Sequence, residues 1–203
     1  MLIYYKHGDR HENKISLTFD DGPILNHTME LLDILFKYKV KATFFLLGKW
    51  AILYPDIVQE IISRGHLVGN HGYEHSLISD DFEKAQQVLK KITGNDIKYL
   101  RPPYGRLHYL GLRKFQSITK IIRWDVCPRD WKQPTSDVIF KRVIENTING
   151  SIILLHDGHE KVSESDRCVQ MLKALPKIIE ALKKQYIFIR LDQMKLIPSR
   201  LLV

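Results

Sequence analysis

Two adjacent aspartates, Asp20 and Asp21, follow an apolar run from Ile15 to Phe19 that is typical of a buried strand. Gly22 and Pro23 end this run with turn residues. Because neighbouring residues on a strand point to opposite sides, two carboxylates at a strand end can do different work. One can bind a metal ion while the other moves a proton. The alternative is that both only turn or cap the chain, and the pair by itself leaves this open.

His71 and His75 are four positions apart. On a helical turn this spacing puts both imidazoles on one face, within reach of one metal ion. The pair alone is a weak signal, since two surface histidines are the more common outcome. With one carboxylate from a neighbouring strand end, the set leaves positions open for water and substrate, which is typical of a catalytic metal site. Zn²⁺ suits these ligands best, and Co²⁺, Ni²⁺ or Fe²⁺ would also fit.

Further chemically capable residues follow other apolar runs. The stretch Arg101 to Gly105 contains Pro102 and Pro103 and therefore cannot be helical. Its two prolines could hold the Tyr104 backbone N–H toward a pocket. The alternative is a plain turn in which Arg101 is only a surface charge. The later candidates at strand ends are Trp124, Asp125, Asp130, Trp131, His156 and Asp157.

The elements that must position these residues alternate between strands and helices. The pattern predicts strands at 15–19, 42–47, 67–69, 98–100, 119–126, 151–155 and 186–191. It predicts helices at 28–38, 55–63, 80–91, 107–116, 136–146 and 168–184. Such alternation implies parallel strands joined by right-handed crossovers. The fold is then an open doubly wound sheet or a barrel with one unit fewer than eight, and either binds ligands at the carboxyl ends of its strands.

Composition narrows the class of protein. A chain of 203 residues with 44% hydrophobic residues is expected to form a single domain, 1–203. No stretch approaches the roughly 18–20 apolar residues of a membrane span. The net charge of +8 is spread along the chain without a nucleic-acid motif, which favours a solvated basic surface and no nucleic-acid partner. Cys127 and Cys168 are expected to be unpaired thiols, although a bridge between them is the alternative.

The N-terminal ten residues carry charges and lack the apolar core of a signal peptide. We therefore expect a cytoplasmic location if Met1 is the native start, and an extracytoplasmic one if an export segment has been removed. We expect a monomer.

Five motifs together resemble those of the polysaccharide deacetylases, the NodB homology domain of carbohydrate esterase family four. They are Thr18–Pro23, His71–His75, Arg101–Gly105, Trp124–Trp131 and Leu154–His156, and they occur in the family's order. The resemblance implies an α/β fold, a distorted (β/α)7-8 barrel of parallel strands like a TIM barrel. It also implies a metal-dependent hydrolase that removes acetyl groups from N-acetylglucosamine units of a glycan or, in some members, from acetylated xylan.

The resemblance also implies a role for each matching residue. Asp21, His71 and His75 would hold the metal. Asp20 would be the general base with Arg101 as its orienting partner, and His156 the general acid with Asp130 keeping it protonated. The Tyr104 backbone N–H would stabilise the oxyanion, and Trp124 and Leu154 would line the acetyl pocket.

Some residues depart from the family pattern. Gly72 stands where Ser or Thr is more usual, so a supporting hydroxyl is lost. Cys127 occupies a position that is often Asp, and we expect it to be a small buried residue rather than a stray metal ligand. Asp125 rivals Asp130, which we prefer because it directly precedes Trp131. The histidines outside the motifs are expected to be non-catalytic; they are His7, His11, His27, His66, His108 and His159.

Two other functions remain open on the sequence. One is the hydrolysis of a small cyclic amide, as in allantoinase-like relatives, which tend to lose the metal-ligand motifs that this chain keeps. The other is a non-catalytic carbohydrate-binding barrel, which the presence of Asp20, Asp21 and His156 disfavours. The substrate glycan and its length are not indicated by any motif.

Overall fold

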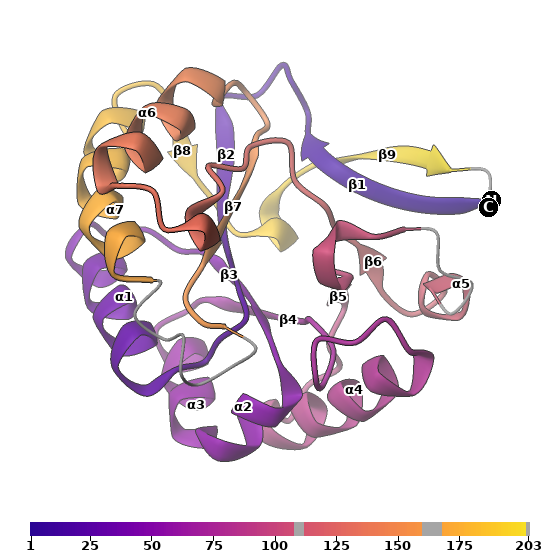
Figure 1. Cartoon of the computed structure of the whole chain (residues 1–203). Helices are drawn as coiled ribbons and strands as arrows, with labels where there is room; N and C mark the ends of the chain where they lie inside the picture. Colours follow the sequence, from indigo (N-terminus) through magenta and orange to yellow (C-terminus); the bar gives the residue numbers. More distant parts are fainter. Residues whose placement is uncertain (108–111, 160–167, 202–203) are drawn as a thin grey trace.

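A computed structural model describes residues 1–107, 112–159 and 168–201. Parallel strands form one curved sheet in the order β6-β5-β4-β3-β2-β7, and β8 pairs with the start of β2 (Figure 1). The bounds of these strands are β2 Lys14–Asp20, β3 Thr43–Leu46, β4 Leu67–Asn70, β5 Tyr99–Leu100, β6 Lys120–Ile121, β7 Ile152–His156 and β8 Ile187–Phe188. The expected α/β class with parallel, barrel-like curvature is confirmed.

Helices surround this sheet on its outer face, as Figure 1 shows. Their bounds are α1 Leu25–Lys37, α2 Gly48–Leu53, α3 Pro55–Ser63, α4 Ser79–Thr93, α5 Leu112–Phe115, α6 Ser136–Asn146 and α7 Val169–Leu182. Short 3-10 turns occur at η1 Pro103–Gly105, η2 Asp130–Lys132 and η4 Leu191–Gln193. The predicted start of α6 is confirmed, because the Thr135 hydroxyl accepts a hydrogen bond from the Val138 N–H.

The central strands of the sheet, β2, β3, β4 and β7, are buried on both faces. In β2, Ile15, Leu17 and Phe19 are fully buried in the large apolar cluster that also holds residues of α1 and α7. The alternate side chains of the same strand, Ser16 and Thr18, are polar and equally buried. Successive strand residues point to opposite faces, so the polar set that ends in Asp20 is separated from the helix-facing set. This alternation places the Asp20 side chain on the face of the sheet opposite to the helices.

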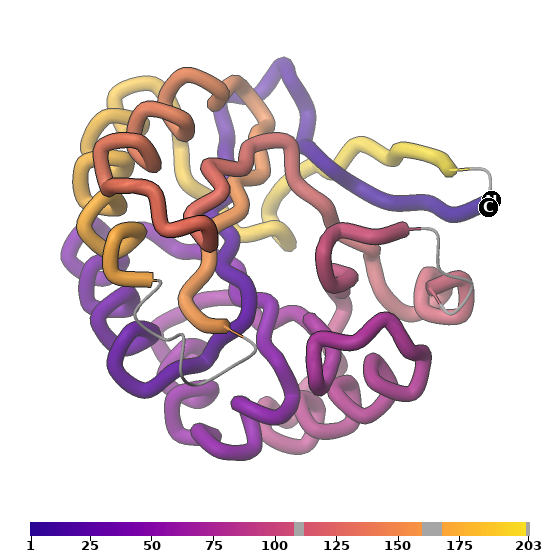
Figure 2. Tube along the Cα trace, viewed as in Figure 1, coloured from indigo at the N-terminus to yellow at the C-terminus, as the bar shows by residue number. Residues whose placement is uncertain are grey.

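An antiparallel ribbon of β1 (Leu2–Gly8) and β9 (Leu196–Leu201) was not predicted. It brings the two chain ends together, with Leu2 opposite Leu201, and Figure 2 shows the two segments side by side. Single bridges join Tyr5 to Ile122 and His7 to Ser151. The ribbon therefore links the end of the sheet at β6 to the segment that begins β7.

Several element predictions need correction. The predicted strand 119–126 is only β6, because the chain leaves the sheet after Ile121 and returns at the isolated Val126–Ile153 bridge. Of the predicted helix 107–116 the structure describes α5, while 108–111, including His108, lie outside the described residues. Helix α2 was missed because its six residues are too few to show a period. Among the described helices, none is long and apolar enough to cross a membrane.

Candidate active site

A cavity of about 270 Å³ opens where the strands end. Most of the predicted site residues line it, and Arg101 and Asp130 lie directly behind them, bonded to Asp20 and His156. The lining residues are Asp20, Asp21, His71, His75, Pro102, Tyr104, Gly105, Trp124, Trp131, Leu154, His156 and His159. The expectation that ligands bind at the carboxyl ends of parallel strands therefore places the candidate site correctly.

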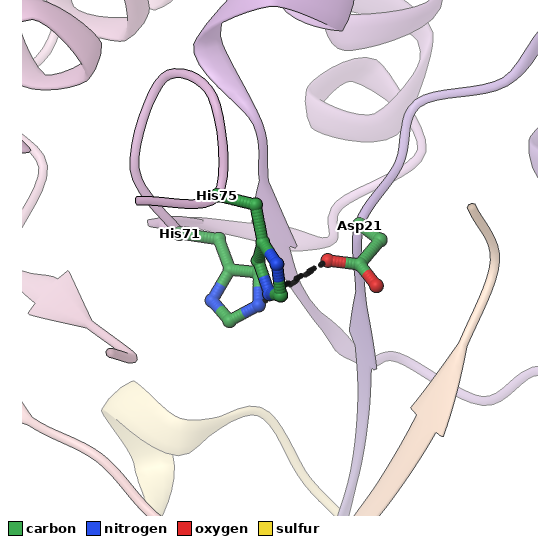
Figure 3. A group of neighbouring side chains, drawn as sticks. All are labelled: Asp21, His71 and His75. Atoms are coloured by element: carbon green, nitrogen blue, oxygen red, sulfur yellow. Dashed lines mark ion pairs between the residues drawn. The ribbon is translucent and has the colours of Figure 1, made fainter. Parts of the chain in front are cut away.

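Asp21, His71 and His75 form a cluster whose ligand atoms all lie within 4.8 Å of one another (Figure 3). Asp21 Oδ1 lies 3.3 Å from His71 Nε2 and 3.5 Å from His75 Nε2. The Nδ1 atom of His71 lies 2.8 Å from the Arg101 carbonyl oxygen, which can only accept, so Nδ1 carries the proton. Nε2 of His71 is thereby left to face Asp21. This second contact is typical of a metal-binding histidine.

Burial alone would raise the pKa of Asp21, but the neighbouring imidazoles of His71 and His75 outweigh it and hold that pKa well below its ordinary value. Burial opposes charge on His71 as well, yet Asp20 and Asp21 raise its pKa above the ordinary value. In the part of the chain that the structure describes, no group donates a well-formed hydrogen bond to the buried Asp21 Oδ1 atom, and His71 Nε2 lies 3.3 Å from it. An ionised, poorly satisfied carboxylate beside two imidazoles fits a divalent cation, which would displace the imidazole protons on binding.

The loop between the two histidines is not the helical turn that their spacing suggested. Gly72 has φ +90° and His75 has φ +65°, so the chain turns through left-handed conformations instead. Asp81, in the first turn of α4, accepts hydrogen bonds from the backbone N–H groups of Tyr73 at 2.8 Å, Glu74 at 2.9 Å and Ser76 at 3.3 Å. From the sequence, Asp81 was expected only to lie in the first turn of the predicted helix 80–91; its position shortly after the His pair was the one available signal.

Asp20 is held by a fully buried arginine. Arg101 Nη1 lies 2.6 Å from Asp20 Oδ1 and 2.8 Å from the Thr18 hydroxyl, and Arg101 Nη2 donates to the Arg123 carbonyl at 3.2 Å. The guanidinium also stacks on the Phe45 ring at 4.1 Å. The other Asp20 oxygen, Oδ2, lies 3.6 Å from His71 Nε2. Asp20 is thus oriented by Arg101 and presents its second oxygen beside the Asp21–His71–His75 cluster.

His156 is paired with Asp130 in the same way. Its Nδ1 lies 2.9 Å from Asp130 Oδ1, and its backbone N–H donates to Asp130 Oδ2 at 2.8 Å. Burial opposes protonation, but Asp130, helped by Asp21 and Asp20, raises the pKa of His156 to about 9. The rival Asp125 lies elsewhere: its carboxylate accepts from Arg10 at 2.6 Å and from the Ile152 N–H at 2.7 Å. At neutral pH His156 can therefore hold a proton at the cavity.

Aromatic side chains form much of the cavity wall. Tyr104 is 61% exposed, and its ring centroid lies 4.5 Å from that of His75. Gly105 has φ +63°, and a Cβ there would lie 2.5 Å from the Trp124 ring, so this position requires glycine. Trp131, a strand-end candidate to which the sequence assigned no role, lines the cavity and packs edge-on against His156 at 5.1 Å. These rings surround the cavity while leaving its mouth open.

Both cysteines are free thiols, as expected. Cys127 is partly buried, and burial raises its pKa to about 11. A neutral thiol of this kind is a poor metal ligand. The described ligand cluster contains no sulfur.

Comparison with known proteins places this site in a family. A family model described as polysaccharide deacetylase matches residues 7–114. The chain belongs to the polysaccharide deacetylase family. A Bacillus cereus relative named peptidoglycan-N-acetylglucosamine deacetylase is 37% identical over 87% of this chain and 66% of its own length. The chain spans between 37% and 66% of the lengths of the first curated relatives.

Solved structures of the deacetylase family superpose well on this fold. A peptidoglycan N-acetylglucosamine deacetylase bound to 4-naphthalen-1-yl-N-oxidanyl-benzamide gives a TM-score of 0.87 at 35% identity, over 94% of this chain and 92% of the other. A Bacillus anthracis protein described as a CE4 family pseudoenzyme gives a TM-score of 0.82 at 26% identity, over 93% and 67% of the two chains. Members of one fold thus include both a named deacetylase and a named pseudoenzyme.

Proposed function

We propose that this chain is a metal-dependent hydrolase that removes acetyl groups from N-acetylglucosamine units of a glycan, with peptidoglycan as the first substrate to test. One observation carries the proposal: the Asp21–His71–His75 cluster with its ionised carboxylate, a second carboxylate held by Arg101 and a protonated His156 lie at one cavity. The named activity of the Bacillus cereus relative supports the substrate class.

We propose that Asp21, His71 and His75 hold the metal, and that it is zinc. When bound, such a cation polarises a carbonyl group and lowers the pKa of water beside it. The arrangement of the ligands supports this role: His71 is fixed through Nδ1, and Asp21 offers a buried oxygen without a hydrogen-bond donor. Imidazole and carboxylate ligands also accept cobalt, nickel and iron(II), so the choice of zinc is tested separately by metal reconstitution.

The chain's own residues then divide the proton transfers. Asp20, oriented by Arg101, takes a proton from the attacking water through its Oδ2 side. His156 gives a proton from Nε2 to the leaving amine, because its Nδ1 is already bonded to Asp130. Each such transfer contributes roughly 10²–10⁴-fold to the rate. The Tyr104 backbone N–H stabilises the oxyanion, and Trp124 and Leu154 contact the acetyl methyl group. All three residues line the cavity.

The test is acetate release from peptidoglycan, chitooligosaccharides, poly-N-acetylglucosamine and acetylated xylan. We expect release from an N-acetylglucosamine-containing substrate that stops with a chelator and returns with zinc. The variant His156→Ala should release acetate at least about 100-fold more slowly. Absence of turnover on every substrate with metal present would contradict the proposal and favour a non-catalytic barrel, for which the pseudoenzyme neighbour gives a precedent of fold.

A further inference from the structure

A second, larger cavity of about 760 Å³ lies at the opposite edge of the sheet. Its walls include the residues that begin β5 and β6, Tyr99 and Lys120, which face each other across the parallel pair. The candidate active site uses the other ends of the strands, where Arg101 follows β5. The two cavities therefore serve opposite edges of the barrel, and the second takes no part in the proposed hydrolysis.

The second cavity is positively charged. Lys90, Lys98 and Lys120 line it, opposed by one carboxylate, Asp96, which lies 2.7 Å from Lys90 Nζ. Among the described residues, neither Lys98 nor Lys120 forms an ion pair within 4 Å, although the Asp96 charge also acts on Lys98. Three lysines therefore face one carboxylate there, which leaves the cavity positive. The Lys120 amine lies 5.9 Å and 6.0 Å from the ring centroids of Tyr5 and Tyr99. The cavity can therefore offer cationic donors to an anion.

The remaining walls suit a sugar ring more than a bare ion. The volume lies within the range of pockets for small organic ligands, about 300–1,000 Å³, and far exceeds what a single phosphate fills. Tyr5 is half-buried and Tyr99 is 7% exposed, so one ring is available for stacking and the other closes the wall. Aromatic rings present an apolar surface beside a polar group, which matches the mixed faces of a saccharide.

We infer that this cavity binds an acidic saccharide, a sugar unit that carries a carboxylate, with Lys98 and Lys120 meeting the carboxylate and Tyr5 contacting the ring. Such a site would hold an anionic glycan at the edge of the barrel remote from the hydrolytic residues. It requires neither the metal cluster nor the proposed activity.

Glucuronate and glucose are the probes, because they differ at one carboxylate and neither has an acetyl group to engage the active site. NMR titration of the metal-loaded protein should show glucuronate moving the amide signals of residues 96–99 and 116–120, while glucose moves them far less. The double variant Lys98→Gln/Lys120→Gln should weaken glucuronate binding about tenfold or more. Raising the salt concentration from about 0.05 to 0.5 M should weaken glucuronate binding in the wild type, since salt screens the attraction between the lysines and the carboxylate.

The matched control is Lys173→Gln/Lys184→Gln, which removes two exposed lysines near α7 and lowers the net charge equally. We expect it to leave glucuronate affinity unchanged, and Tyr5→Ala to weaken it. Equal weakening by the control, equal binding of glucose, shifts confined to the metal cluster, or sulfate binding as tightly as glucuronate would each overturn the inference. Acetate release from a short neutral chitooligosaccharide should be unaffected by Lys98→Gln/Lys120→Gln, so this result is independent of the proposed hydrolysis.

Discussion

The strand-end residues and the loop 71–76 bring their side chains to the same cavity by different means. Asp20 and His156 occupy paired positions at the ends of β2 and β7, and each has a buried partner of opposite charge. His75 instead lies on a loop with positive φ angles, whose backbone is held by Asp81 from α4. Sheet register fixes Asp20 and His156, the proposed proton-transfer residues, whereas one carboxylate fixes the loop that carries His75, a proposed metal ligand.

This difference implies that the two parts can be damaged separately. A change at a strand end should alter proton transfer while the metal ligands stay in place. A change at Asp81 should alter how well the loop presents His75 while Asp20 and His156 keep their partners. Rates and metal affinities, measured on the same variants, are therefore expected to respond to different substitutions.

The largest effect is expected when the two neighbouring aspartates, Asp20 and Asp21, are substituted. Asp20→Asn keeps a group that can accept from Arg101 but removes the base, so kcat should fall about 10²–10⁴-fold with metal affinity nearly unchanged. Asp21→Asn removes a charged ligand and should weaken metal binding itself. Metal content and affinity, measured by competition with a fluorescent chelator, distinguish the two. Equal loss of metal in both variants contradicts this division of labour.

The next effect concerns the acid at the other strand end. Asp130 is the main cause that raises the pKa of His156 to about 9, so Asp130→Asn should lower that pKa toward its ordinary value near 6.5. The proposed acid, His156, must be protonated to act, so activity should fall as pH rises through its pKa. The alkaline limb of the kcat profile should therefore move to lower pH in the variant.

Asp125→Asn is the matched control for the acid pair. It removes an aspartate from the same segment, but that side chain contacts Arg10 and the start of β7 instead of His156. We expect reduced stability with no movement of the alkaline limb. A shift of equal size in both variants would show that Asp130 does not set the proton affinity of His156.

A smaller effect is expected from the ligand loop. Asp81→Ala leaves three backbone N–H groups of residues 73–76 without their acceptor, so metal affinity should weaken about 10–100-fold. Asp80→Ala, one position away in the same helix turn, is the control and should leave affinity unchanged. A metal affinity that Asp81→Ala does not alter would mean that the loop keeps its shape without this carboxylate.

The same contrast explains what could be predicted from the sequence. Strand ends were predictable because apolar runs such as Ile15 to Phe19 show where a strand stops, and parallel topology gathers those ends at one edge. The pairing of His156 with Asp130 followed from a family motif. The conformation of the loop was not predictable, because the spacing of His71 and His75 also fits a helical turn. The observed turn depends on the positive φ of Gly72 and on Asp81, whose carboxylate accepts hydrogen bonds from the loop backbone in the folded chain.

The N-terminal ribbon shows the same limit. The run Leu2 to Tyr5 in β1 contains strand-favouring residues, but it was not predicted as a strand, and its partner β9 lies at the other end of the sequence. The position of β1 is determined by pairings of the folded chain, in which Tyr5 bridges to Ile122 and His7 to Ser151. The periodicity of apolar residues within one segment does not indicate which distant segment that strand pairs with.

The smallest expected effect is on the stability of the metal-free protein. The folded pKa of His156, about 9, is above its unfolded value near 6.5, so protonation of His156 stabilises the fold fully below about pH 6.5. This contribution is lost as pH rises through about 9. Urea unfolding with a chelator present should show this loss in the wild type. It should be about 3 kcal/mol, because raising a pKa from 6.5 to about 9 is worth roughly 1.4 kcal/mol for each pH unit between them. Because Asp130→Asn removes the cause of the shift, its stability should depend less on pH between these limits; identical slopes in the two proteins would mean that His156 titrates near its ordinary pKa.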